Sequence, residues 1–402
     1  MRQCCNVRLN LTFLSVILLP LLTGCWSSHE IEELSLEVGI ALDKGEVSTI
    51  EKELEDQVDG YPESDNITVT FQSVNPKVAG AASKGGGSQQ KSYLNISETG
   101  DSLFKIVREI PLRRDRPMIG YHLKVIVISE DLLSMYSIEE MLDIFLRDSA
   151  IRPSCLVLIS KGRATGALES KEMGEIPAFR LIKMVDNEYR TSKILPPMPL
   201  IKLTGKMQSE SSFLLQNVIS ANGEVKFAGA AVINGKTKKL LGFLNEEEIE
   251  GITWITGKGK GGMVKSFDHE KGKLIAYEIK SMKSKIIPHI NNGDISFEVN
   301  IESEGQLSES WVTTENPFDN KFLKKTEKTI ETEVKQLMKN VVRKMQEDYQ
   351  ADVAGFGNQL RIKYPNIWDN VKKDWDETFS KIPIKYNVEV TITNYGTMGT
   401  KN

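Results

Sequence analysis

The chain has few cysteines, and three of the four lie at its N-terminus. Cys4, Cys5 and Cys25 fall within the first 25 residues of 402, which leaves Cys155 as the one cysteine of the remainder. A disulfide within that remainder is excluded, so its stability must come from packed cores, which this length can provide. Cys155 begins an apolar run over residues 155–159 and is predicted to be a small buried hydrophobic side chain.

Neither a basic excess nor a second long apolar segment is present. The 51 Lys and Arg residues face 55 Asp and Glu, a formal net charge of −4, which argues against a nucleic-acid partner. After Cys25 no apolar run reaches the roughly 18 residues of a membrane-spanning helix, and the best runs have the length of strands. The part of the chain after Cys25 is therefore expected to be water-soluble.

Motifs of catalysis and metal binding are also missing. No histidine has a partner at H-E-x-x-H spacing, and there is no G-x-S-x-G elbow, P-loop or C-x-x-C pair. Residues 257–262 fit the G-x-G-x-x-G spacing, but a predicted helix precedes them and an extended segment follows, whereas a dinucleotide turn needs the reverse order. Asp374, Asp376 and Glu377 are expected on the solvated side of a helix. The sequence predicts no enzyme, no cofactor and no metal site.

The first 25 residues have the layout of a bacterial lipoprotein signal. Two arginines precede an apolar run over residues 11–22, which is too short for the roughly 20 residues of a membrane-spanning helix. Leu22-Thr23-Gly24-Cys25 closes the run and resembles a lipobox, in which the thiol receives diacylglycerol, the signal is cut before the cysteine and the new terminus is acylated. We predict a signal peptide over residues 1–24 and lipid attachment (N-palmitoyl, S-diacylglycerol) at Cys25. Two or more acyl chains suffice for stable anchoring.

Hydrophobic periodicity divides the rest of the chain into three units. Strand patterns at 66–74, 123–128 and 155–159 alternate with helix patterns at 99–108 and 138–146, which predicts an α/β-like N-terminal domain over residues 25–195. A further short helix is predicted at residues 26–37 and a mobile Gly- and Ser-rich loop at 80–90. Prolines at residues 195–199 are expected to form the link to the next unit.

The second and third units are predicted to be β-rich and α+β. A small middle domain, residues 196–262, has two strand patterns around Asn234-Gly235 and a short helix at 246–255. In the C-terminal domain, residues 263–402, alternating strands at 295–302 and 384–392 accompany a long amphipathic helix at 322–349 and a second helix with Trp368 and Trp375 as core residues. The predicted fold class is α+β multidomain, ending in an antiparallel sheet packed with one long helix and shorter helices.

A line of charged residues follows one side of the predicted long helix. Its members are three or four residues apart: Glu327, Glu331, Lys335, Lys339 and Arg343. Such pairs contribute roughly 0.2–0.5 kcal/mol each when exposed. The line is either a solvated face or a surface that meets another subunit.

Several stretches, in order along the chain, together resemble the Ger(x)C family, the C subunits of spore germinant receptors. In the first half they are Leu22-Thr23-Gly24-Cys25-Trp26, His29-Glu30-Ile31-Glu32-Glu33-Leu34, Val38-Gly39-Ile40-Ala41-Leu42-Asp43, Tyr121-His122-Leu123-Lys124-Val125-Ile126-Val127-Ile128 and Phe145-Leu146-Arg147-Asp148. In the second half they are Phe227-Ala228-Gly229-Ala230-Ala231-Val232, Leu241-Gly242-Phe243-Leu244, Gly355-Phe356-Gly357, Tyr364-Pro365-Asn366-Ile367-Trp368 and Asp374-Trp375-Asp376-Glu377-Thr378-Phe379.

The resemblance implies a three-domain lipoprotein on the outer face of the spore inner membrane. It implies assembly with two integral-membrane partners, the A and B subunits, into a receptor that senses nutrients and triggers germination, and it implies no catalytic residues. Two other classes stay open: a solute-binding lipoprotein of a transporter, which needs two similar lobes, and an envelope hydrolase, which needs a nucleophile or a metal.

Overall fold

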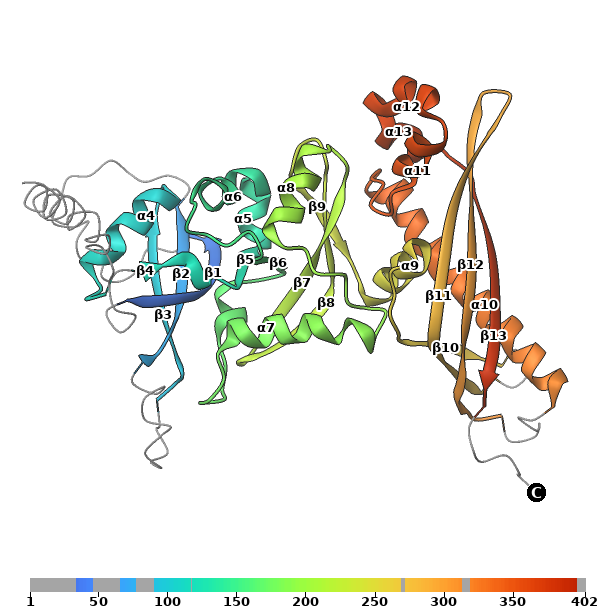
Figure 1. Cartoon of the computed structure of the whole chain (residues 1–402), viewed down its shortest axis with the longest axis horizontal. Helices are drawn as coiled ribbons and strands as arrows, with labels where there is room; N and C mark the ends of the chain where they lie inside the picture. The colour runs from blue at the N-terminus through green and yellow to red at the C-terminus, as the bar shows by residue number, and fades with distance from the viewer. Residues whose placement is uncertain are drawn as a thin grey trace, which may run out of the picture.

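The structure is a computed structural model, and it describes residues 34–45, 66–76, 90–116, 118–268, 272–312 and 319–395. The predicted signal peptide and Cys25 lie outside the described residues, as does nearly all of the predicted loop at 80–90. The described part forms two units, each built on a β-sheet, which stand side by side (Figure 1).

The first unit is a large mixed sheet with helices on both faces. The strand order is β3-β2-β1-β5-β6-β7-β8-β9, with the short β4 paired to β1, and the central pairs β1·β5, β5·β6 and β6·β7 are parallel. The strands are β1 (Ser35–Lys44), β2 (Ile67–Val74), β3 (Tyr93–Gly100), β4 (Met118–Ile119), β5 (Val125–Ser129), β6 (Leu156–Ser160), β7 (Phe213–Ala221), β8 (Glu224–Ile233) and β9 (Leu240–Leu244). The helices are α4 (Leu103–Glu109), α5 (Glu130–Met135), α6 (Ile138–Arg147), α7 (Pro177–Val185) and α8 (Leu200–Gln208).

Each face of this sheet has its own hydrophobic core. One face has a core to which Ile106 of α4, Leu142 of α6 and Leu203 of α8 belong, and on the other face Leu181 of α7 shares a core with alternate residues of β5 and β6. Parallel strands that are covered on both faces read as continuous apolar runs. The predicted α/β-like character is confirmed, with β5, β6, α4 and α6 close to their predicted positions.

Strands β1, β3, β4 and β7 of the first unit were not predicted. Residues 35–37, predicted to end a helix, begin strand β1, and residues 26–33 of that predicted helix lie outside the described residues. The helical prediction failed there because β1 is buried on both sides and shows no period-2 alternation. Strand β3 lies at the edge of the sheet and pairs only with β2. It was missed because its sequence is largely polar and lacks a clear alternation of apolar residues.

The large sheet continues across the proline link. β7 pairs with β6, and β8 and β9 extend the same sheet, so the strands of the predicted middle domain do not form a sheet of their own. The long β8–β9 loop and the helix α9 (Glu246–Thr256), which ends at Gly257 with φ 64°, follow the predicted order. The division at residues 195 and 262 stays a prediction.

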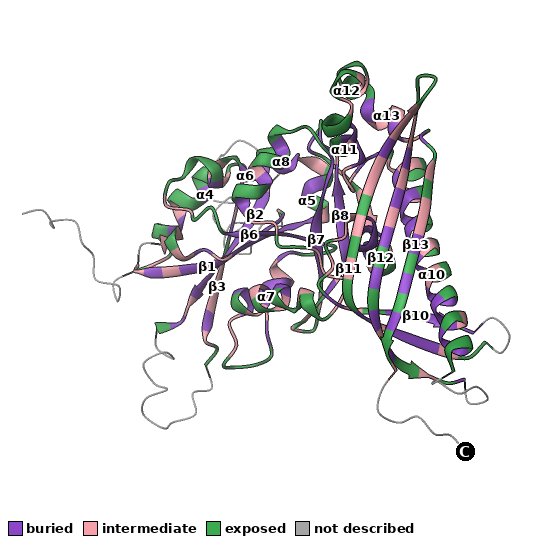
Figure 2. Ribbon diagram, turned by 45° about the vertical axis from the view of Figure 1, so that its right-hand side comes forward, coloured by how far each residue is buried: buried purple, intermediate pink, exposed green. Residues whose placement is uncertain are grey.

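The second unit is a four-stranded sheet crossed on one face by a long helix (Figures 1 and 2). Its elements are β10 (Met263–Phe267), β11 (Leu274–Asn291), β12 (Asp294–Ser310), α10 (Asn320–Arg343), α11 (Phe356–Lys363), α12 (Pro365–Val371), α13 (Trp375–Phe379) and β13 (Ile384–Asn394). The strands predicted at 295–302 and 384–392 lie in β12 and β13, which pair in parallel and not antiparallel as expected, whereas β10, β11 and β12 are antiparallel to one another. Strand β11 was not predicted. A parallel neighbour is possible because the connection through α10–α13 is long enough to cross over.

The helices of the second unit bury the side chains that were predicted to be core residues, but both predicted helices are interrupted. The predicted stripe on α10 is buried, with Val334 completely inaccessible, and a π turn at Lys344–Asp348 follows the helix. The second predicted helix is divided into α12, a 3-10 turn and α13. Trp375 is buried and meets the half-buried Trp368 edge to face, with ring centroids 5.3 Å apart, so their predicted core role is confirmed.

One core joins the two units. Trp254 of α9 packs with Leu214 and Val232 from the first sheet and with Val341 of α10. The alternate residues of β7 and β8 belong to the core on the opposite face of the first sheet. In the part of the chain that the structure describes, no helix combines the length and the apolar character needed to cross a membrane.

Candidate functional site

Neither an accessible thiol nor a metal-binding cluster is found among the described residues. The Cys155 thiol is buried, and burial raises its pKa well above the usual range, so it is unreactive as a nucleophile. Among the described residues no group of three or more His, Cys, Asp or Glu side chains could hold a metal ion. Asp374 and Glu377 are exposed as predicted, while burial raises the pKa of the half-buried Asp376 despite the nearby Lys236.

Residues 257–262 have the structural context that was expected. They connect the end of α9 to β10, so no helix opens on their last glycine. The dinucleotide-binding interpretation therefore has no support in their geometry.

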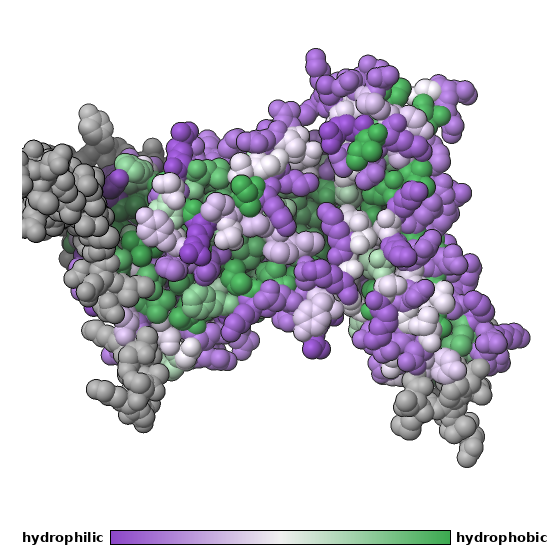
Figure 3. Space-filling model, in the orientation of Figure 1, coloured by the Kyte–Doolittle hydropathy of each residue, from purple (hydrophilic) through white to green (hydrophobic). Residues whose placement is uncertain are grey.

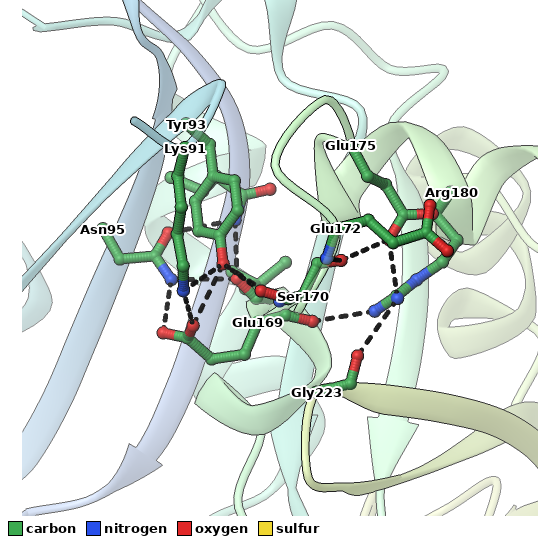
Figure 4. A network of polar contacts seen from close by, with 11 residues as sticks. Lys91, Tyr93, Asn95, Glu169, Ser170, Glu172, Glu175, Arg180 and Gly223 are labelled. Carbon is green, nitrogen blue, oxygen red and sulfur yellow. Dashed lines mark hydrogen bonds and ion pairs between the residues drawn. The ribbon is translucent and has the colours of Figure 1, made fainter. Parts of the chain in front are cut away.

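A cluster of polar side chains lies where β3 meets the segment before α7 (Figure 4). The Tyr93 hydroxyl donates to Glu169 Oε2 at 3.0 Å and accepts from the Ser170 N–H at 2.9 Å. Lys91 Nζ donates to the same Glu169 oxygen at 3.0 Å and to the Tyr93 hydroxyl at 2.9 Å, and Asn95 Nδ2 donates to Glu169 Oε1 at 3.1 Å. Both carboxylate oxygens of Glu169 thus accept hydrogen bonds from β3 and from Lys91, two residues before it.

Arg180 of α7 extends this cluster to the β7–β8 turn. Its Nη1 donates to Glu175 Oε2 at 2.7 Å and to the Gly223 carbonyl at 3.3 Å, and its Nη2 donates to the Glu169 carbonyl at 2.8 Å. Ser170 Oγ donates to Glu175 Oε2 at 2.6 Å (Figure 4). The cluster therefore ties the edge of the sheet to α7 and to a hairpin distant in sequence.

The electrostatics of the cluster are those of a structural clamp. Burial alone would raise the pKa of Glu169, but the hydrogen bonds from Lys91, Tyr93 and Asn95 outweigh it and lower the pKa below the usual value. The hydrogen bonds to Tyr93 and Glu169 raise the pKa of Lys91, so both partners stay charged. With its pKa lowered and three hydrogen bonds to its two oxygens, the Glu169 carboxylate is a weak base at neutral pH. Sequence reasoning missed this cluster because its partners are separated by more than 70 residues.

Asp43 and Gly39, both in stretches that carry the family resemblance, have packing roles. Asp43 is buried and accepts hydrogen bonds from the backbone N–H groups of Ala164 and Thr165 at 2.6 and 2.9 Å. A Cβ on Gly39 would lie 3.1 Å from Leu168. These residues hold the 3-10 turn at Thr165–Leu168 against β1.

In the second unit, Gly357 and Trp375, which lie in stretches that resemble the family, also have packing roles. Asp352 Oδ2 accepts from the N–H of Gly357 at 2.7 Å and from the indole Nε1 of Trp375 at 3.1 Å, and a Cβ on Gly357 would lie 2.7 Å from that indole nitrogen. Asp352 was not singled out from the sequence, although an acidic residue shortly before the helix that starts at Phe356 is a capping signal.

A close contact between the two units leaves no room for a side chain at Gly242. A Cβ there would lie 2.8 Å from the ring of Tyr349, whose hydroxyl donates to the Phe243 carbonyl at 2.8 Å. Lys344 Nζ donates to the same carbonyl at 3.1 Å and to both oxygens of Glu248 at 2.9 Å. The π turn after α10 is thereby held against β9 and the start of α9.

The predicted charged line on α10 is exposed only in its second half. Glu327 is buried, where its Oε1 accepts the Ile392 N–H of β13 at 2.9 Å, and Glu331 pairs with Lys328 at 2.9 Å. Lys339 and Arg343 are exposed and Lys335 is half-buried. We name these three residues the basic face of α10.

A polar groove lies at the end of the basic face, between α10 and the start of α9. It has a volume of about 310 Å³ and is lined by Asn245, Glu247, Glu248, Leu337, Asn340, Arg343, Lys344, Glu347 and Asp348. Sites for small nutrients are usually enclosed and mostly apolar, whereas this groove carries charges of both signs. Its chemistry suits contact with another protein. Figure 3 likewise shows a largely hydrophilic surface over the second unit on the side viewed.

Comparison with known proteins gives a consistent family assignment. Residues 27–219 match the family model described as spore germination protein N-terminal domain, and residues 228–396 match the model described as spore germination B3/GerAC like, C-terminal. The chain is 56% identical to spore germination protein YndF of Bacillus subtilis (strain 168) over 96% of both chains. It is 30% identical to spore germination protein A3 of the same organism over 94% of this chain and 96% of that one.

A solved structure agrees with this assignment. The crystal structure of the GerBC protein matches with a TM-score of 0.60 and 26% identity, covering 83% of this chain and 96% of that chain. The junction of the two family models, between residues 219 and 228, falls within the β7–β8 hairpin.

Proposed function

The chain belongs to the spore germination B3/GerAC-like family, and from this premise we propose that it is the lipoprotein C subunit of a nutrient germinant receptor. The observation that carries the proposal is the match of both halves of the chain, in order, to spore germination proteins and to the GerBC fold. Asp43, Gly242 and Gly357 belong to the stretches that resemble the family, and each makes a packing contact or hydrogen bond within this fold. Their structural roles therefore support the proposal.

The subunit acts by contact. It assembles with the A and B integral-membrane subunits on the outer face of the spore inner membrane and is needed there for receptor assembly and signalling. The Glu169 carboxylate is held in hydrogen bonds with a lowered pKa and the Cys155 thiol is buried, which agrees with a role without chemistry of its own. We assign the basic face of α10 and its groove as the surface that meets a partner subunit.

The transporter alternative has less support. A solute-binding lipoprotein needs two similar lobes around a cleft, but the two sheets here differ in strand number, strand order and helix arrangement.

Affinity purification from detergent-solubilised spore membranes tests the proposal. Mass spectrometry should find two integral-membrane proteins of one receptor with the tagged chain. Recovery of an ATPase and a permease in their place would support the transporter instead.

The lipid anchor has its own prediction. Cys25→Ala removes the thiol that diacylglycerol would alkylate, so the signal should stay uncleaved or the protein should leave the membrane fraction. Mature size and membrane retention are read from immunoblots of fractionated cells, with Cys155→Ala as the control that keeps the lipobox intact. A Cys25→Ala protein of normal size that stays with the membrane would contradict the anchor.

A further inference from the structure

The helix α4 and the 3-10 turn at Ile110–Leu112 carry apolar side chains on their outer side. Phe104, Val107 and Leu112 are 57%, 40% and 85% exposed, whereas Ile106 and Ile110 are buried against the first sheet. Figure 2 shows most of α4 as exposed. A surface helix normally presents polar residues to water, so this outer side is unusual in having apolar residues there.

Basic side chains surround the apolar ones. The Arg108 guanidinium lies over the Phe104 ring, 5.0 Å from its centroid, and the exposed Lys105 pairs with Asp101 at 3.6 Å. Residues 101–116 hold five basic and three acidic side chains in a chain whose net charge is −4. We name Phe104, Lys105, Val107, Arg108 and Leu112 the α4 face. Exposed apolar and aromatic residues flanked by Lys and Arg are the composition of helices that lie in a bilayer interface.

The α4 face lies near the start of the described chain. Strand β4, whose Met118 follows Leu112 by six residues, pairs with the first two residues of β1, Ser35 and Leu36. Ser35 lies ten positions after Cys25, a span of at most about 35 Å when fully extended. A lipid on Cys25 would therefore hold this part of the molecule close to the membrane.

We propose that the α4 face docks on an anionic phospholipid surface and sets the orientation of the protein on the membrane. The proposal rests on the lipid anchor proposed above, because the anchor supplies proximity while the face supplies a second, oriented contact. Anionic headgroups complement Lys105 and Arg108, and the acyl boundary receives Phe104, Val107 and Leu112.

A protein partner fits this face less well. A stable protein interface buries about 800 Å² on each side, whereas three apolar side chains with two basic ones form a small patch. A bilayer surface imposes no such shape requirement.

The test uses the full lipoprotein, purified from membranes and reconstituted into vesicles. A Leu112→Cys variant carries an environment-sensitive fluorophore, and Ile362→Cys, 64% exposed on α11, is the matched control. Cys155 is buried and leaves the label specific. In vesicles with phosphatidylglycerol, the label at position 112 should shift to the blue and be quenched several-fold more by spin-labelled lipids than the label at 362.

Charge variants test the electrostatic part. Lys105→Glu with Arg108→Glu should reduce the quenching at position 112 at least twofold, whereas Lys321→Glu with Lys385→Glu, both exposed in the second unit, should not. Vesicles of phosphatidylcholine alone should give weaker quenching than those with phosphatidylglycerol.

Three outcomes overturn the docking. If the protein floats with vesicles but the label at 112 is no more quenched than that at 362, the face fails while the anchor stands. If the protein does not float, anchor and docking fail together. If the label at 112 is shielded in spore membranes with partner subunits but exposed in pure vesicles, the face binds protein.

Discussion

At the scale of single residues, two buried glutamates affect stability. Glu37 on β1 is 4% exposed, and burial raises its pKa to about 7 despite a hydrogen bond with Ser35 and the charge of Arg114. Glu250 on α9 is 5% exposed, and burial raises its pKa to about 7 as well, against the opposing charge of Lys193. Both carboxyls therefore hold a proton in the folded state at mildly acidic pH.

These shifts predict that the protein loses stability as the pH rises from 4.5 to about 7. In that window the folded state binds more protons than the unfolded one, so the free energy of unfolding falls with pH. Each shift corresponds to on the order of 3 kcal/mol. The melting temperature at pH 5 should exceed that at pH 8 by several degrees, measured by calorimetry.

Substitution of one glutamate identifies the cause. Glu250→Gln should raise the melting temperature at pH 8 and flatten the pH dependence, whereas Glu139→Gln, at an exposed position of α6, should change neither. A profile that stays equally steep in Glu250→Gln would mean that other groups carry the pH dependence.

At the scale of elements, the long helix α10 carries much of the second core. Its inner side packs on the sheet and on α9, and Val334 near its middle is completely buried among Trp254, Val341 and Phe297 in one cluster. A helix of this length is stabilised by its buried stripe more than by propensity.

Val334→Asp should destabilise the protein by about 3–5 kcal/mol, because it would bury an unpaired charge. The melting temperature should fall by roughly 10 °C and abundance should drop. Thr332→Asp places the same charge at an exposed position of the same helix and should leave both almost unchanged. Equal effects of the two substitutions would show that the stripe is not the buried side.

The sequence predicted those elements whose burial leaves a periodic pattern. The stripe of α10, the apolar runs of β5 and β6 and the turn after β8 were identified because local spacing reports them. Strand β1 lacks alternation because both faces are buried, and the parallel direction of β13 depends on a long crossover that no local pattern encodes.

The long-range contacts of the candidate site could not be predicted from the sequence either. The clamp between Lys91 and Glu169 joins residues far apart in the chain, and the burial of Glu327 follows from its bond to β13. The sequence predicted that the charged residues of α10 share one side of the helix, but not which of them are exposed. Tertiary structure decided which half of that side meets water.

At the scale of the whole molecule, the two units are held together and present different surfaces. α9 contributes to a core shared by both units, and Tyr349 with Lys344 joins the end of α10 to β9. The basic face and its groove lie beside this junction. A contact made there can therefore act on both units together, which suits a subunit that couples the parts of a receptor.

The most direct test of the central claim, that the protein acts by contact within a germinant receptor, is reversal of the basic face. Lys335, Lys339 and Arg343 are replaced together by Glu, and the control replaces the exposed Lys321, Lys373 and Lys385 by Glu. Co-purification of the A and B subunits is quantified from spore membranes, the nutrient response is followed in the same spores, and the melting temperature of each purified variant reports folding. We predict that the face variant folds normally but recovers several-fold less of both subunits and germinates slowly, while the control behaves like the parent. A face variant that folds, assembles and germinates like the parent would contradict the assignment of this surface, and absence of both subunits from the parent purification would contradict the receptor role itself.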